Sequence, residues 1–203
     1  MRPASSFDFG LTGFAERFHQ DWRHDGSAVD VLAALLGPDT DPREVEALRS
    51  DALLMRRGLT GEEIETLWGA GTGGTFWFGP DGVWPSGPSW LEVIAERCDQ
   101  WLRTYGEPEP EPEPGRELAD TVAAEIRTMT AAVPERLDPG HAVADALLRC
   151  VQVSPDLAFR WCLRIARLRG WPLQRSQYER LVALGEQFEY GEFIVSDAEY
   201  LTE

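Results

Sequence analysis

The chain has 203 residues and a net charge of −16 at pH 7, with a pI near 4.6. Such an acidic chain is a poor ligand for nucleic acids and anionic membranes, which are polyanions, and it favours basic proteins as partners. Apolar residues make up 43%, as in globular proteins, and the length suits one large core or two small ones. No apolar run is long enough for a signal peptide or a membrane span, so we expect a cytoplasmic protein.

The first predicted helix covers residues 9–23. Large apolar residues recur there every three or four positions, which is the spacing of one helical stripe. The residues at this spacing are Leu11, Phe14, Phe18 and Trp22. His19, Gln20 and Asp21 lie between the last two, and we expect their side chains to point away from the stripe.

Four more helices are predicted in the first half, and they cover about residues 28–36, 42–56, 61–68 and 89–104. Capping signals mark where they begin. The single cap residues are Ser27 and Ser89, and the two capping boxes run from Asp41 to Glu44 and from Thr60 to Glu63. Gly37 and Gly58 are expected to end helices in the left-handed conformation.

Aromatic residues are concentrated between two of these helices. Residues 75–78 and 83–84 flank the turn sequence 79–82, which is compatible with a short β-hairpin that Pro85 and Pro88 would limit. We expect most of these aromatic side chains to cover the core. One or two are expected at the surface, where aromatic residues anchor protein interfaces.

Residues 107–115 alternate Glu and Pro and predict a stiff, solvated linker. This linker divides the chain into residues 1–106 and residues 116–203. The first part has nine Arg against 17 acidic residues, a net charge of −8, whereas the second has ten Arg against 14 acidic residues, a net charge of −4. The sequence therefore predicts two helical domains, of which the first is the more acidic.

Four helices are predicted in the second part. Apolar residues recur at helical spacing from Leu118 to Met129, and another helix is expected to begin at Asp138-Pro139. Ser154-Pro155 is expected to begin a third helix, with Pro at its favoured first position, and Gly170 to end it. A fourth is expected around residues 178–188. The predicted fold class is mainly α.

The segment from Phe18 to Trp22, with the sequence Phe-His-Gln-Asp-Trp, resembles the opening of the immunity proteins of bacterial contact-dependent growth inhibition systems. The resemblance covers about residues 9–104, and Trp90-Leu91 also matches the pattern of the family. It implies a small helical domain that binds and occludes a cognate toxin domain in the cytoplasm, without catalysis, cofactor or metal. Residues after Tyr105 lie outside the resemblance, so it implies no role for 116–203.

A basic toxin is the partner that the acidic charge favours, because a toxin that is a nuclease must hold a phosphate backbone. The acidic residues predicted to bind it are Asp21, Asp25, Glu62, Glu63 and Glu65. Neither nucleic acid nor membrane is expected as a partner, and the oligomeric state is left open. The alternative function is a non-catalytic regulatory or scaffolding module unrelated to toxins.

Sites for chemistry are weaker interpretations. His19 and Asp21 are two apart, and His19 and His24 five apart, so neither pair has the helical spacing of an acid–base pair or a metal site. The Gly-rich run of residues 69–74 follows a helix rather than a strand and has no P-loop Lys, which argues against a phosphate site and indicates a flexible loop. The three cysteines are expected to be buried and unpaired.

One basic cluster is present, because Arg160, Arg164 and Arg167 share one helical face, with Arg169 close by. Such a face is able to dock an anionic ligand. We favour instead an intramolecular role, in which these side chains pair with acidic residues of the same chain. The acidic partners available near the C-terminus are Glu186, Glu189, Glu192, Asp197 and Glu199.

Overall fold

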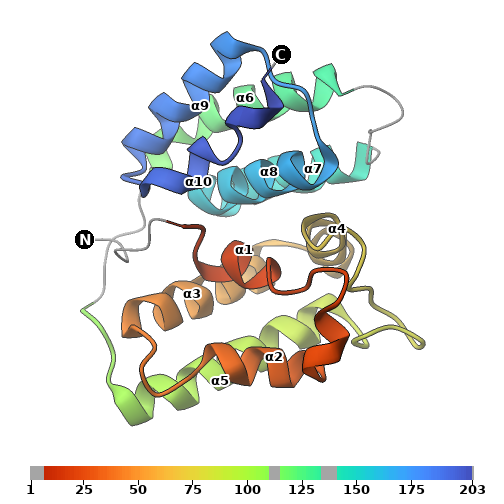
Figure 1. Ribbon diagram of the computed structural model, residues 1–203, viewed down its shortest axis with the longest axis vertical. Helices are drawn as coiled ribbons and strands as arrows, with labels where there is room; N and C mark the ends of the chain where they lie inside the picture. Colours follow the sequence, from red (N-terminus) through yellow and green to blue (C-terminus); the bar gives the residue numbers. More distant parts are fainter. Residues whose placement is uncertain (1–6, 110–114, 134–140, 203) are drawn as a thin grey trace.

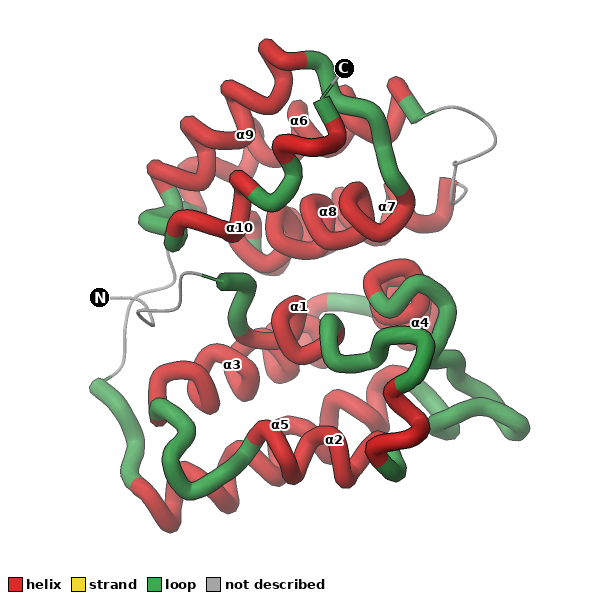
Figure 2. Tube along the Cα trace, viewed as in Figure 1, coloured by secondary structure: helices red, strands yellow, loops and turns green. Residues whose placement is uncertain are grey.

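The computed structural model describes residues 7–109, 115–133 and 141–202. It is mainly α-helical, and Figure 2 shows helices joined by loops, with no strand in these ranges. The helices of the first half are α1 (Gly10–Ala15), η1 (Trp22–Asp25), α2 (Ala28–Leu35), α3 (Pro42–Gly58), α4 (Gly61–Gly71) and α5 (Gly87–Tyr105). Those of the second half are η2 (Arg116–Leu118), α6 (Ala119–Ala132), α7 (His141–Val153), α8 (Pro155–Arg169), α9 (Arg175–Gln187), α10 (Glu192–Ser196) and η4 (Glu199–Leu201).

The two halves of the chain form two stacked groups of helices (Figure 1). In the first group α3 pairs along its length with α5, and α1 lies on α3. In the second group α6, α7 and α8 pack on one another, while α9 packs against α6 and α10. The groups meet where α1 and α4 contact α8, and where α3 and α4 contact α7.

The core is continuous across both groups. Buried apolar residues from α1 to η4 belong to one cluster, which includes Trp68 of α4 and Trp161 of α8, both fully buried with ring centroids 6.2 Å apart. Whether residues 1–106 and 116–203 each fold alone stays a prediction, but within this structure they share a core. Most of the predicted linker, residues 110–114, lies outside the described residues.

Two interface glycines let the groups approach closely. A Cβ on Gly71, at the end of α4, would lie 2.1 Å from a ring carbon of Trp161. A Cβ on Gly58, at the end of α3, would lie 2.3 Å from a methyl group of Val153. Neither glycine has a positive φ. Close packing, rather than backbone conformation, therefore requires Gly at both positions.

The first predicted helix is too long. α1 ends at Ala15, and the amides of Glu16, Arg17 and Phe18 donate to carbonyls three residues earlier rather than four. In the turn that follows, the carbonyl of Phe18 accepts a hydrogen bond from the hydroxyl of Thr75, a residue beyond α4. A contact between residues distant in the sequence thus replaces the continued helix, which helical periodicity alone cannot foresee.

The other predicted helices of the first half are present, with small shifts at their ends. Ser27 and Thr60 form capping boxes with Asp30 and Glu63. Asp41 caps α3 through the amide of Arg43, without the predicted box to Glu44.

Three predicted end signals differ from the structure in part. The cap of α5 is Ser86 rather than Ser89, which extends that helix by two residues at its start. α3 ends at Gly58, as expected, but neither Gly58 nor Gly37 is left-handed, and the cap residues of α2 and α3 are Leu36 and Leu59.

The aromatic segment does not form the predicted hairpin. Its pairing is a single parallel bridge between Phe78 and Trp84, where a hairpin needs antiparallel pairing. The fully buried ring of Phe76 packs edge-on against Phe18 and fixes the aromatic segment to the core.

The Gly-rich run is partly helical rather than a loop throughout. α4 continues to Gly71, and the left-handed turn falls at Gly73 and Gly74.

In the second half, α6 and α8 confirm their predictions, including the Ser154 cap and the left-handed Gly170. α9 agrees with the fourth predicted helix, whereas α10 and η4 were not predicted because they are short. The predicted helix start at residues 138–139 lies outside the described ranges, and α7 is described from His141. None of the helices in the described part of the chain is long and apolar enough to cross a membrane.

Candidate functional site

Residues 18–22, here called the motif segment, present polar side chains between two aromatic anchors. Phe18 and Trp22 are 1% and 3% exposed, whereas His19, Gln20 and Asp21 are exposed. The indole Nε1 of Trp22 donates to the carbonyl of Thr75 at 3.3 Å. The expected core position of the two aromatics and the outward position of the triplet are therefore confirmed, although the segment is a turn rather than a helix.

An open groove lies beside the motif segment, with a volume of about 610 Å³. Its lining combines the triplet and the end of α4 with residues from the end of α8 and from η4. The charged and large lining residues include Glu16, Asp21, Arg164, Arg167, Leu168 and Tyr200. The groove thus draws its walls from both halves of the chain, although the family resemblance covers only the first.

Salt bridges inside the chain neutralise the basic wall of this groove. Arg167 contacts Glu16 at 3.0 Å and Asp197 at 3.6 Å. Arg164 contacts Glu16 at 3.5 Å and donates through Nε to the carbonyl of Gly71 at 2.6 Å. Burial lowers the pKa of Arg164, and the charge of Glu16 opposes that effect. Both guanidinium groups are therefore held by acceptors of the chain itself.

Arg160, one turn earlier on α8, is buried at the interface between the two groups. It donates two hydrogen bonds of 2.9 Å to the carboxylate of Asp51 and one of 2.9 Å to Asp156. Its guanidinium also lies 4.3 Å from the ring centroid of Phe9. Burial alone would lower the pKa of Arg160. The negative charges of Asp156 and Asp51 outweigh that effect and raise this pKa well above its ordinary value.

The Arg face is thus intramolecular, as favoured from the sequence, but its partners differ from those expected. Asp51 and Glu16 come from the first half, and of the five acidic residues proposed near the C-terminus only Asp197 contacts this face. Pairing across more than a hundred positions could not be read from sequence spacing.

The five acidic residues predicted to bind toxin do not form one site. Asp21 lies in the motif segment and Asp25 at the end of η1. Hydrogen bonds of Phe18 and Trp22 with Thr75 hold this region beside the C-terminal end of α4. Glu62 and Glu63 lie at the opposite end of α4, which at 11 residues is roughly 15 Å long. Asp21, Asp25 and Glu62 are exposed.

Glu63 and Glu65 have structural contacts. The Glu63 carboxylate accepts a hydrogen bond from the amide of Thr60 at 2.7 Å, completing the capping box, and lies 3.8 Å from Arg149. The Glu65 carboxylate accepts one from the amide of Gly87 at 2.9 Å, at the start of α5. The acidic starts of helices that suggested a binding surface thus also stabilise the fold.

The exposed aromatic residues were only partly foreseen. Trp77 is 45% exposed, as expected for one member of its segment, and Arg23 lies 4.4 Å above its ring. Tyr200 is 69% exposed and Leu168 is 47% exposed, and both line the groove. Sequence reasoning missed them because an isolated Tyr near the C-terminus and a Leu on an apolar helix give no signal of exposure.

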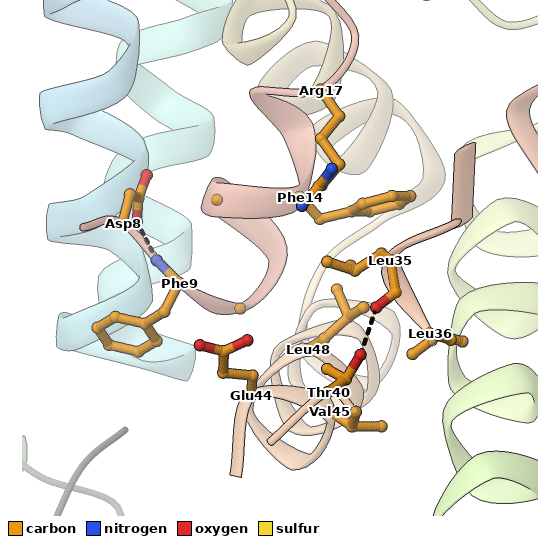
Figure 3. Close-up of a pocket in the computed structure, with 12 residues that line it drawn as sticks. Asp8, Phe9, Phe14, Arg17, Leu35, Leu36, Thr40, Glu44, Val45 and Leu48 are labelled. Atoms are coloured by element: carbon orange, nitrogen blue, oxygen red, sulfur yellow. Dashed lines mark hydrogen bonds between the residues drawn. The ribbon is translucent and has the colours of Figure 1, made fainter. Parts of the chain in front are cut away.

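A second, smaller pocket of about 200 Å³ lies between α1, the end of α2 and the start of α3. Figure 3 shows Phe14, Leu35 and Leu48 directed toward one another, with Glu44 on the side of Phe9. Burial raises the pKa of Asp8, which lines this pocket, and nearby Arg160 opposes the shift. None of the residues predicted to bind toxin lines it.

The remaining titratable candidates are dispersed. Across the described ranges, no group of three or more His, Cys, Asp or Glu residues is arranged to hold a metal ion. The amide of Asp21 donates to Nδ1 of His19 at 3.3 Å, which is a contact of the turn itself. Cys98, Cys150 and Cys162 are buried free thiols, as expected from the sequence.

No protein-family model matches the chain, and neither does any curated protein or any solved structure.

Proposed function

We propose that this chain is an immunity protein that acts in the cytoplasm by binding and occluding a basic toxin domain. The observation that carries the proposal is the motif segment, in which three consecutive polar side chains are exposed between two buried aromatics. A short polar turn held by Phe18 and Trp22 is rigid, so it loses little conformational entropy when a partner binds. In this proposal the chain acts on the toxin by contact and not by catalysis.

The charge of the chain supports a basic partner. The first half carries a net charge of −8 and the whole chain −16. Opposite charge accelerates diffusional encounter, and fast capture is what protection against a toxin requires. Asp21 and Asp25 lie on or next to the presented turn, and neither forms an ion pair with a described residue. They are the carboxylates best placed to contact the partner.

The test is protection in living cells. Candidate toxin domains are taken from the genes that neighbour the one for this chain, and each is expressed in a sensitive bacterium, with and without the chain. Growth should be restored by the chain, and the purified proteins should form a complex whose association rate falls as salt rises. Unrestored growth together with no complex would contradict the proposal. It would favour a regulatory or scaffolding module instead.

A further inference from the structure

The second half of the chain supplies part of the groove, and this placement gives it a role that the sequence did not. Leu168 of α8 and Tyr200 of η4 line the groove together with residues of the motif segment. The Tyr200 hydroxyl donates to the carbonyl of Arg167 at 3.0 Å, so its exposed ring is held in place. An exposed, pre-positioned Tyr beside an exposed Leu has the composition of an interface anchor.

The charge around the groove selects a cationic group. Glu16 and Asp197 already neutralise Arg164 and Arg167, whereas Asp21 lacks an ion-pair partner among the described residues. The C-terminal ends of α4 and α8 both reach the groove, at Thr72 and Leu168. Donors of the chain itself already meet both ends, since Arg164 donates to the carbonyl of Gly71 and Tyr200 donates to the carbonyl of Arg167. Asp21 is therefore the carboxylate of the groove that remains for an incoming cation.

A contact between a basic side chain and an aromatic ring is already present next to the motif segment. There Arg23 lies over the exposed ring of Trp77, with 4.4 Å between guanidinium carbon and ring centroid. A basic side chain in the groove would meet a comparable ring face at Tyr200, and in addition an apolar surface for its stem at Leu168 and a carboxylate at Asp21.

We infer that this groove is the docking surface for a loop of the basic toxin domain, with an Arg or Lys side chain entering between Asp21 and Tyr200. The inference rests on the proposed function and extends it by making residues 116–203 half of the binding site. Both halves are then needed for full affinity, because neither forms the groove alone.

The experiment measures the dissociation constant of the full chain for the neighbouring toxin domain in a catalytically inactive form. Asp21→Arg, Leu168→Ala and Tyr200→Ala are each expected to raise it roughly tenfold or more. Tyr200→Phe keeps the ring but loses the hydrogen bond to the carbonyl of Arg167, so it should raise the dissociation constant less than Tyr200→Ala does. Two changes outside the groove serve as matched controls, Tyr105→Ala and Glu186→Arg, both at exposed positions.

Thermal unfolding of each variant separates lost binding from lost folding. If wild type binds and the three groove variants bind equally well, the docking surface is wrong while the proposed function stands. If wild type does not bind the toxin domain at all, the proposed function fails and takes this surface with it. Equal losses in the groove variants and the two controls would also overturn the assignment.

Discussion

Arg160 and Asp51 form a two-pronged salt bridge across the interface between the two groups of helices, although 109 positions separate them in the sequence. Both side chains are almost completely buried, and Asp156 shares the same guanidinium. Charges removed from water are costly unless each has its partner. This contact therefore links the two halves within the folded structure.

Removal of the Arg160 charge should strongly destabilise the whole chain. Arg160→Leu leaves the carboxylates of Asp51 and Asp156 buried without a cation, and the loss of one partner of a buried pair costs about 3–5 kcal/mol. Arg169→Leu, at an exposed position of the same helix, is the control for the change in charge. Chemical unfolding measures the stability of both variants, and similar unfolding midpoints would contradict a structural role for the salt bridge.

The close approach at Gly71 predicts opposite effects for two neighbouring glycines of α4. Gly71→Ala pushes a methyl group against Trp161 and should cost about 1–3 kcal/mol. Gly69→Ala has no neighbour within 4 Å and should stabilise the helix by roughly 0.5–1 kcal/mol. Thermal melts of both variants check the prediction, which fails if Gly71→Ala melts at or above the wild-type temperature.

Cutting the chain between the halves should not separate them. A site-specific protease sequence placed within residues 107–115 allows the linker to be cleaved in the folded protein. Because the halves share one core, we expect the fragments to co-elute in size-exclusion chromatography and to unfold in one transition. Two separately eluting, folded fragments would instead support independent domains.

Two adjacent acidic residues at the start of α4 should behave differently. Glu63→Arg removes the capping box and should lower stability by about 1 kcal/mol, whereas Glu62→Arg at its exposed neighbour should leave stability within roughly 0.5 kcal/mol. With the toxin domain as partner, Glu62→Arg should slow association less than Asp21→Arg. A larger effect at Glu62 would move the binding surface to the start of α4.

The buried thiols should be inert in the folded chain. Burial raises the pKa of Cys98 and of Cys162 from 9.0 to about 12. A thiol reagent at pH 8 is therefore expected to react only after unfolding. The stability that the protonated thiols contribute is fully present below pH 9 and is lost as pH rises from 9 toward 12. Fast labelling of the native chain would show that these sites open readily.

Local signals predicted most of the helices, because caps such as Ser154 and stripes of apolar residues act over a few positions. Features set by distant contacts were not predictable in the same way. The first helix ends at Ala15, and the hydrogen bond from Thr75 holds the carbonyl of Phe18 in the turn that follows. The groove also depends on how η4 is placed beside the motif segment, and no spacing in the sequence encodes that placement.

The position of Arg160 also bears on how such a chain can change over generations. The Glu-Pro run between the halves looks like a natural point for recombination, at which one first half could be exchanged for another. An exchanged first half without an acid at the position of Asp51 would leave Arg160 unpaired in the interior. A new first half would also need glycine where Gly58 and Gly71 meet Val153 and Trp161. An exchange of halves is therefore expected to yield a stable chain only when the new half preserves these contacts, so new specificities are expected to arise by substitutions around the groove.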